Sequence, residues 1–530
     1  MAMIRDIRKL IWVVRFGTPI PLSRHIDSGN KVLIAVLIIG LLGLALRFYG
    51  IDNPLLDSHA ERQAQAAMVA SNLYQGGINW WCTRLDMFGT GNTCHLLEFP
   101  VMQIIVAMAY SITGEASVVG RLIAIAFSIG SIGFFYGIAR YHLKGLGIVV
   151  AVAIYALAPF SVYFGRAFMA ESSMMFFSLA SLYFVLRYFE SSRNLFYCFA
   201  IVTGALALLA KPTVVIILFP IVAVWVRSFG YGAMKKRSLW IYLIMASIPE
   251  AIWVAYSWTQ PNQDIPESWH LLSLVFDRGG IFSMWIDPRF YMRVGGSILL
   301  GYLTPFGLIL ACIGVLGHWR NEASVVICCW IMGVVAYLLL LAGANTGHIY
   351  YQLPVLPLGC LLAGMGAEFI AGNKFVSQWL FSKITIAVLI PLTLSSMMGY
   401  GYLYYSLGSY MYDVDRRMPY TMEVSSIVAQ NSTGSEWFVV NQPSASTSVV
   451  TYLAARESVK MTLQGNLEDI QALEKFRDQG ASLFVVLDTS YGSGMEESQA
   501  NETFWYYLNE EYRAIALQEH YAVFDIRVQQ

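Results

Sequence analysis

The sequence predicts a mainly α-helical protein that crosses a membrane many times and carries a small α/β domain at its C-terminal end. Of the 530 residues, 57% are hydrophobic and only 13% are charged, and the mean hydropathy is +0.56. Soluble domains usually contain about 25% charged residues. The apolar residues gather in long runs, and the composition from about Leu407 onward is that of a soluble domain. The formal net charge is zero, so no overall field attracts nucleic acid, and no such partner is expected.

The N-terminal segment is basic and precedes the first long apolar run. Its own apolar stretch is short, and no small-residue cleavage site follows, so a cleaved signal peptide is not expected. We interpret this segment as a cytoplasmic tail with an interfacial helix.

Eleven apolar runs have the length of a membrane-crossing helix, which needs about 20 residues. They are centred near residues 32–48, 117–138, 146–164, 173–188, 195–210, 213–227, 238–256, 297–316, 323–342, 353–370 and 384–406.

The run 99–114 is ambiguous, and the distribution of positive charge resolves it. Cytoplasmic loops collect Lys and Arg. If 99–114 does not cross, the basic loops around Arg140, Arg187, Lys235 and Lys374 all lie on the side of the basic N-terminus. We therefore predict a membrane-parallel or re-entrant helix at 99–114, within the first external loop. Eleven crossings then place the C-terminal end on the external side of the membrane, the periplasm if this is a bacterial inner membrane.

The C-terminal part reads as a small α/β domain. Short apolar β-rich segments such as "EWFVVN", "ASLFVVLD" and "YAVFDIR" alternate with a helical pattern in "NLEDIQALEKFRDQG". We predict a transmembrane domain over residues 1–406 and an external α/β domain over 407–530.

Two of the seven cysteines differ from the rest in position. Cys82 and Cys94 lie in the first external loop, whereas the other five lie in apolar runs where cysteine acts as a small packing residue. An external loop is an oxidising place, so we predict a Cys82–Cys94 disulfide.

Polar residues that interrupt apolar context gather in the loops predicted to be external. Ionisable residues at membrane depth are costly and indicate a functional site. The set comprises Asp57, His59, Glu61, Arg62, Arg84, Asp86, Glu98, Arg166, Glu171, Lys211, Asp264, Glu267, His270, Asp277, Arg278, His348, Tyr350 and Tyr351.

The stretch "LLDSHAERQAQ" has both a structural and a functional interpretation. Ser58 and Glu61 have the spacing of a helix capping box. This does not explain His59 and Arg62. A carboxylate at the membrane surface can accept a proton from an acceptor hydroxyl, and Asp57 is the best-placed candidate.

Further candidates follow along the chain. Glu98 ends the loop that begins at Asp57, and two convergent carboxylates could bind a divalent metal ion. Glu171 stands at the start of an apolar run, where it could simply begin a helix. Lys211 in "LLAKPTVV" has almost no polar sequence around it, and a phosphate would give it a partner.

The last candidates are aromatic or imidazole side chains. His348, Tyr350 and Tyr351 in "GANTGHIYYQLPVLP" directly precede a membrane helix. Tyrosines at this position are common in aromatic belts, but a histidine is less usual. His270 lies in the Trp-rich loop 257–293, which suits a lid or a sugar-stacking surface.

Together these motifs resemble the C-type integral-membrane glycosyltransferases (GT-C), specifically the protein O-mannosyltransferases of glycosyltransferase family 39 and the lipid A aminoarabinose transferases. The matching stretches occur in the family's order and cover most of residues 30–370: "DSHAERQAQAAMVASNLYQGG", "EFPVMQIIVAMAYSITGEASVVGRLIAI", "YFGRAFMAESSMMFFSLASLYFVLRY", "LLAKPT" and "HIYYQLPVLP".

The resemblance implies a hexosyl- or pentosyltransferase of the cell envelope that uses a polyprenyl-phosphate sugar. It implies that Asp57 is the catalytic base, that Glu171 is the acidic residue of the second external loop and that Lys211 binds phosphate, a role that Arg62 and Arg84 could share. The acceptor is a lipid, a glycan or a protein, and a single displacement would invert the anomeric carbon. The mannosyltransferases carry Asp-Glu where this chain has Asp57-Ser58, which leaves the acceptor open.

Two other classes remain as alternatives. A transporter or flippase of lipid-linked sugars would carry polar groups near the bilayer midplane and often an internal repeat, and the sequence has no evident repeat. A membrane scaffold would not need Lys211 or His348 to interrupt apolar context.

Overall fold

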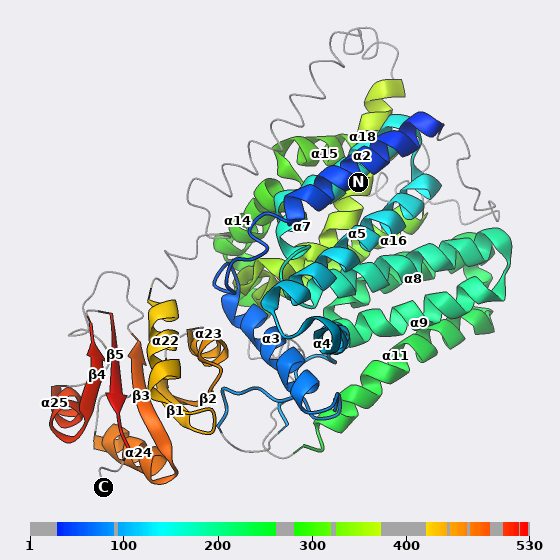
Figure 1. The fold of residues 1–530 in the computed structure, drawn as a ribbon. Coiled ribbons are helices and arrows are strands. Elements are labelled where there is room, and N and C mark those ends of the chain that lie inside the picture. The colour runs from blue at the N-terminus through cyan, green and yellow to red at the C-terminus, as the bar shows by residue number, and fades with distance from the viewer. Residues whose placement is uncertain are drawn as a thin grey trace. The chain divides into compact units, whose positions relative to one another are not determined.

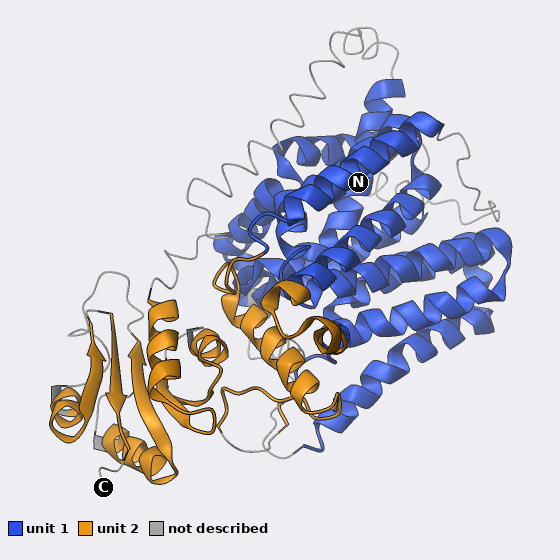
Figure 2. Ribbon diagram, in the orientation of Figure 1, with its two compact units in different colours: residues 1–51, 97–105, 121–407 blue, residues 52–96, 106–120, 408–530 orange. Residues whose placement is uncertain are grey.

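The computed structural model describes residues 29–89, 94–260, 280–319, 325–372, 420–442, 446–463, 467–487, 502–518 and 520–527. The chain divides into two compact units (Figure 2). Unit 1 comprises residues 1–51, 97–105 and 121–407, and unit 2 comprises residues 52–96, 106–120 and 408–530. The predicted N-terminal interfacial helix and the predicted crossing at 384–406 lie outside the described residues.

The described part of unit 1 consists of helices and connecting turns (Figure 1). They are α2 Asn30–Arg47, most of α5 Ser117–His142, α6 Gly145–Leu157, α7 Pro159–Phe164, α8 Glu171–Ser191, α9 Asn194–Ala210, η1 Pro212–Ile217, α10 Leu218–Phe229, η2 Gly230–Lys235, α11 Arg237–Ser257, α13 Gly280–Ile286, α14 Pro288–Ser297, η3 Ile298–Tyr302, α15 Thr304–Trp319, α16 Val325–Leu340, α17 Ala342–Gly347, η4 Ile349–Val355 and α18 Leu356–Gly372.

Among the described residues, six helical segments are long and apolar enough to cross a membrane, or seven if the pair 288–302 and 304–317, bent by 103°, is one span. Four shorter apolar helices accompany them, and α6, α9 and α16 of this group coincide with predicted crossings. The polytopic helical fold is thus confirmed, while the number of eleven crossings stays a prediction.

The ambiguous run 99–114 forms the helix α4 Val101–Thr113. Its 13 residues extend about 20 Å at 1.5 Å per residue, which is less than the roughly 30 Å of a bilayer core. Because α6 also has 13 residues, length alone does not distinguish a membrane-parallel helix from part of a crossing, and the membrane-parallel position of α4 stays a prediction.

A fully buried arginine joins four helices of unit 1. The Arg47 guanidinium donates to the hydroxyl of Ser128 on α5 (2.9 Å) and to the carbonyls of Ala156 on α6 (2.9 Å) and Ser161 on α7 (3.1 Å). Its Nη1 also bonds the Gly43 carbonyl within α2. Several satisfied donors on one buried charge make this arginine a structural connector.

Unit 2 contains a five-stranded sheet with strand order β2-β1-β3-β5-β4. The β2-β1-β3 part is parallel, and β5 pairs antiparallel with both β3 and β4. The elements are α3 Ala60–Gln75, α22 Thr421–Asn431, β1 Trp437–Gln442, α23 Ser446–Ala454, β2 Glu457–Thr462, α24 Leu467–Asp478, β3 Ala481–Leu487, α25 Glu502–Glu511, β4 Arg513–Leu517 and β5 Tyr521–Asp525.

Helices cover both faces of this sheet (Figure 1). Alternate residues of a strand point to opposite faces. Phe438 and Val440 of β1 pack with α22 and α23, whereas Val439 packs in the cluster that contains Leu473 of α24 and Phe504 of α25. The predicted small α/β domain is confirmed.

The outer edge of β2 is paired with the segment 86–89, which lies in the loop predicted to be external. Phe88 forms an antiparallel bridge with Val459, and the Ser458 amide donates to the Asp86 carbonyl (2.6 Å). The Gly89 amide donates in turn to the Ser458 carbonyl (2.8 Å). An unpaired edge strand invites aggregation, and this loop covers it.

Helix α3 also packs against helix α23 of unit 2. Leu56, Ala60 and Ala64 form a cluster with Val449 of α23, with Tyr452 and Leu453 packed against it. The loop and helix that begin with the predicted base are therefore part of the same compact unit as the C-terminal sheet, an association that the sequence did not indicate.

Candidate functional site

Unit 1 gathers five predicted site residues into what we call the Lys211 cluster, defined by Glu171, Lys211, His348, Tyr350 and Tyr351. The Lys211 ammonium forms an ion pair with Glu171 Oε1. It also lies 4.4 Å from the ring centre of Tyr350 and 4.6 Å from that of Tyr351. The His348 ring stacks on Tyr350 with ring centres 5.2 Å apart.

The local sequence explains why Lys211 stands at a helix break. A residue before proline is held in extended backbone, and Lys211, which precedes Pro212, has φ −166° and ψ 114°. Helix α9 therefore ends at Ala210 and the 3₁₀ turn η1 begins at Pro212. Glu171 is the first residue of α8, and the two tyrosines lie in the 3₁₀ turn η4.

Burial gives this cluster its electrostatic character. The exposed fractions of Lys211 and Glu171 are 4% and 1%. Tyr350 and Tyr351 are buried as well, whereas His348 is exposed. A buried charge is costly unless it is paired, and here an opposite charge and two aromatic faces stabilise the ammonium.

Glu98, in the same unit, lies within electrostatic range of Lys211. The Trp253 indole donates to the Leu97 carbonyl (3.2 Å) and packs edge-on against Phe99 at 5.0 Å between ring centres. These contacts on both neighbours fix the backbone around Glu98.

Two further buried arginines of unit 1 bind the chain where its first long helix has ended. Arg121 Nη1 donates to the carbonyls of Gly50 (3.3 Å) and Ile51 (3.0 Å), and Arg166 Nη1 donates to the same Gly50 carbonyl (2.7 Å). Both side chains are fully buried. They hold the backbone six to seven residues before Asp57.

The second group of predicted residues lies in unit 2 around Asp57. Its carboxylate is buried, with 1% exposure, and Oδ1 accepts a hydrogen bond from the Gln63 amide (2.5 Å). The same amide donates to the Ser58 carbonyl (3.1 Å). Gln63 therefore fixes the orientation of the carboxylate from the first turns of α3.

The expected capping box is wrong. Helix α3 begins at Ala60, and its N-cap is His59, which has a left-handed backbone (φ 57°) and makes no side-chain capping bond. A capping box needs Ser58 at the N-cap position, and the left-handed residue moves the helix start beyond it. Glu61 still lies in the first turn, where its charge favours the helix dipole.

The predicted cationic residues of this loop have local partners. Arg62 is half-buried and donates to Gln65 one turn further along α3 (3.3 Å). Arg84 is half-buried and pairs with Glu457 of β2 at 3.4 Å. His270 lies outside the described residues.

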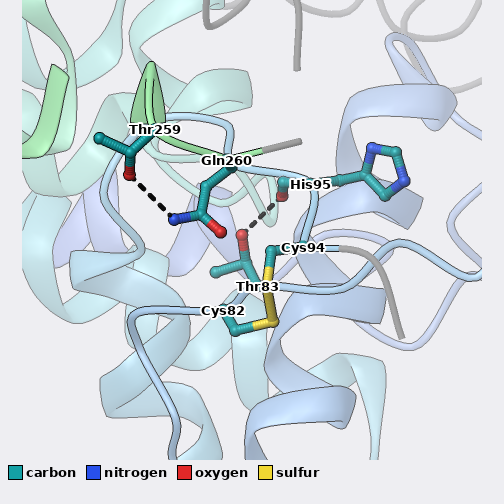
Figure 3. Close-up of a disulfide and its surroundings, with 6 residues drawn as sticks. All are labelled: Cys82, Thr83, Cys94, His95, Thr259 and Gln260. Carbon is teal, nitrogen blue, oxygen red and sulfur yellow. Dashed lines mark hydrogen bonds between the residues drawn. A yellow bond between two sulfur atoms is a disulfide. The ribbon is translucent and has the colours of Figure 1, made fainter. Parts of the chain in front are cut away.

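The Cys82–Cys94 disulfide is present, with the two Cα atoms 4.8 Å apart (Figure 3). The residues that follow the two cysteines, Thr83 and His95, form two hydrogen bonds with each other. Thr83 Oγ1 donates to the His95 carbonyl (2.6 Å), and the His95 amide donates to the Thr83 carbonyl (2.8 Å). Burial lowers the pKa of the His95 imidazole, which stacks on Phe88 at 4.0 Å.

The predicted metal ligands Asp57 and Glu98 belong to different units. Within the described part of the chain, no group of three or more His, Cys, Asp or Glu side chains could hold a metal ion. The geometry thus supplies no support for a metal site at these two carboxylates.

Sequence reasoning missed three important residues: Gln63, Arg47 and Arg121. Gln63 resembles an ordinary residue of a helix surface. The two arginines did carry a signal, because each interrupts or ends an apolar run.

The architecture defines a class: a polytopic helical membrane protein in which the segment 52–96, after the first long helix, belongs to the same compact unit as the C-terminal α/β sheet. Residues 98–258, which include Glu98, Glu171 and Lys211, match the model of the dolichyl-phosphate-mannose-protein mannosyltransferase family. No curated protein matches the chain by sequence.

Solved structures specify this class further. The crystal structure of ArnT from Cupriavidus metallidurans bound to undecaprenyl phosphate aligns with a TM-score of 0.62 and 12% identity, over 95% of this chain and 100% of that chain. The oligosaccharyltransferase AglB from Archaeoglobus fulgidus, in complex with an inhibitory peptide and a dolichol-phosphate, aligns with a TM-score of 0.57 and 11% identity, over 86% of this chain and 69% of that one. The chain has the ArnT-like GT-C fold, and the resemblance predicted from its sequence is confirmed at this level.

Proposed function

We propose that this protein is a glycosyltransferase that moves a sugar from a polyprenyl-phosphate-linked donor to an acceptor hydroxyl on the external face of the membrane. The observation that carries the proposal is the Lys211 cluster, a buried ammonium surrounded by one carboxylate and two aromatic rings. The ArnT and AglB structures with which the fold aligns hold polyprenyl phosphates.

Lys211 is suited to the phosphate of the donor. An ammonium has three donor hydrogens, and the ion pair with Glu171 uses one of them. A phosphate oxygen can therefore bind Lys211 without displacing Glu171. Glu171 and the tyrosine rings position the ammonium and keep it charged while it is buried.

Asp57 is suited to the acceptor hydroxyl. The acceptor oxygen attacks the anomeric carbon, the bond from this carbon to the phosphate oxygen breaks, and polyprenyl phosphate leaves with its electron pair. The hydroxyl proton passes to the Asp57 carboxylate, which Gln63 holds in place. A single displacement of this kind inverts the anomeric carbon.

The test is sugar transfer by the purified full chain from labelled polyprenyl-phosphate sugars to lipid, glycan and protein acceptors. Asp57→Asn should lower kcat by about 10²–10⁴-fold and leave donor binding intact, because only the base is lost. Glu61→Gln, four residues further along in the first turn of α3, is the matched control and should retain activity. If Asp57→Asn transfers sugar as well as wild type, the assignment of the base is wrong.

The same preparation separates this proposal from a flippase of lipid-linked sugars. In proteoliposomes, a transferase consumes the donor on one face only when an acceptor is present. Movement of intact donor across the bilayer, without consumption in any acceptor mixture, would contradict the proposed function and support the transporter.

A further inference from the structure

We propose that unit 2 contains a second ligand site, a pocket for an uncharged glycan at the C-terminal end of α3. This inference rests on the proposed function and specifies its acceptor as a glycan chain. The pocket has a volume of about 420 Å³, and its lining includes Asn72, Gln75, Asn79, Thr83 and Arg84. Small-molecule sites commonly have volumes of about 300–1,000 Å³.

The pocket is built from backbone that is firmly held. The Gly76 amide donates to the Asn72 carbonyl (2.8 Å) at the end of α3, and the Cys82 amide donates to the Asn79 carbonyl (3.2 Å). The Cys82–Cys94 disulfide and the paired Thr83 and His95 fix the opposite wall (Figure 3). A site formed in advance loses little conformational entropy when a ligand binds.

Acidic groups outnumber cationic ones around the pocket, which argues against an anionic ligand. Arg84 is paired with Glu457 at 3.4 Å, and the neighbouring Asp86 accepts a hydrogen bond from Asn72 (2.8 Å). At the other side, Gln75 lies 3.3 Å from a carboxylate oxygen of Glu115. A phosphate or carboxylate would meet these acids, and among the described lining residues the one cation, Arg84, is already paired.

The lining also holds side chains that can bind hydroxyls. A carboxamide both donates and accepts hydrogen bonds, as a sugar hydroxyl does, and the lining contributes three of them, from Asn72, Gln75 and Asn79. The Asn72 amide nitrogen already donates to the Arg84 carbonyl and to Asp86, so this side chain offers its carbonyl oxygen to a ligand. Trp80 and Trp81 follow Asn79 directly, and their exposed fractions are 42% and 46%. Exposed indole rings present flat apolar faces on which the C–H faces of sugar rings can pack.

The position of the pocket indicates a ligand of several sugar units. Asp57 precedes the N-terminal end of α3, whereas Gln75 is its last residue. The 16 residues of α3 extend about 24 Å at 1.5 Å per residue. A glycan held at the far end of α3 would be anchored there while another part of it reaches Asp57, which raises its effective concentration at the base.

The direct test is saturation-transfer NMR on the detergent-purified full chain with uncharged hexasaccharides (maltohexaose, cellohexaose and fully N-acetylated chitohexaose) and with anionic hexagalacturonate. Wild type should give saturable signals for at least one uncharged hexasaccharide and weaker ones for hexagalacturonate. Asn79→Ala and Trp80→Ala should reduce the signal at least fivefold. Gln430→Ala, which removes an exposed amide on α22 of the same unit, should not.

The inference is overturned if no uncharged hexasaccharide shows saturation transfer at millimolar concentration, or if wild type, Asn79→Ala and Trp80→Ala give equal signals. A stronger signal from hexagalacturonate would also contradict an uncharged ligand. In turnover assays, the pocket variants should raise the acceptor KM and leave kcat unchanged.

Failure here is distinct from failure of the proposed function. Asp57→Asn should still bind the hexasaccharide, since it alters only the base. Sugar transfer to a non-glycan acceptor with no glycan binding would refute the pocket alone. Glycan binding without sugar transfer under any condition would refute the transferase alone.

Discussion

Lys211 and Glu171 depend on each other, and this separates their structural from their chemical contribution. Both are buried and form one ion pair. Breaking such a pair from one side leaves an uncompensated buried charge and typically costs about 3–5 kcal/mol, whereas replacing both partners together is often nearly neutral. Stability and activity should therefore respond differently to single and double substitutions.

We predict that Lys211→Met and Glu171→Gln each lower the thermal stability of the purified protein, whereas the double variant regains most of it. Sugar transfer should stay at least about 10²-fold below wild type in Lys211→Met and in the double variant, because both lack the cation for the phosphate. Lys211→Arg keeps the charge and is the matched control. Activity that returns together with stability in the double variant would show that Lys211 is only structural.

Lys211 and His348 could be predicted as site residues from the sequence alone. Lys211 and His348 stand in apolar or aromatic surroundings where a polar residue has no routine purpose. Gln63 could not be found in this way, because its hydrogen bond to Asp57 depends on the left-handed backbone at His59. A local motif, the capping box, was overruled there by a backbone geometry that no sequence rule indicates.

At the scale of elements, the segment 86–89 pairs with the β2 edge next to a small group of charges. Asp86 lies beside Asn72, Arg84 and Glu115, and Glu457 follows on β2. Burial raises the pKa of Asp86 above its ordinary value of 3.8, and Asn72 and Arg84 oppose this only in part. Burial likewise raises the pKa of Glu457. The contact between loop and sheet is therefore sensitive to pH.

The shift in the pKa of Asp86 determines whether the stability of unit 2 rises or falls with pH. A raised pKa means that the folded chain holds the proton more tightly than the unfolded chain does. The stabilising contribution of Asp86 is thus complete below about pH 3.8 and is lost as the pH rises through the higher pKa of the folded state. At neutral pH the half-buried, ionised Asp86 carboxylate reduces the stability of unit 2 relative to its protonated form.

We predict that Asp86→Asn removes this dependence. The amide can still accept the hydrogen bond from Asn72, but it does not ionise. The melting temperature of the variant minus that of wild type, measured by tryptophan fluorescence, should increase between pH 4 and pH 7. A difference that is constant or decreases over this range would contradict the raised pKa.

At the scale of the whole molecule, composition was sufficient for the fold class. Long apolar runs against 13% charged residues predicted the polytopic helical part, and short apolar β-rich segments interleaved with a helical pattern predicted the small α/β domain. The pairing of the 83–89 loop with β2 was not predictable, because it joins segments more than 360 residues apart through backbone hydrogen bonds. Backbone amides and carbonyls are the same in almost every residue, so the side chains of this loop do not indicate which strand it pairs with.

The orientation in the membrane is the last prediction, and it depends on α4. If the 13-residue α4 does not cross, the basic loop after α8 is cytoplasmic and the C-terminal sheet is external. A cysteine at each of two exposed serines tests this orientation: Ser192 in the loop after α8 and Ser435 before β1. In intact spheroplasts, a membrane-impermeant maleimide should label Ser435→Cys at once and Ser192→Cys only after permeabilisation, with wild type correcting for the native cysteines. The reverse pattern would show that α4 crosses, and it would place the C-terminal sheet on the cytoplasmic side.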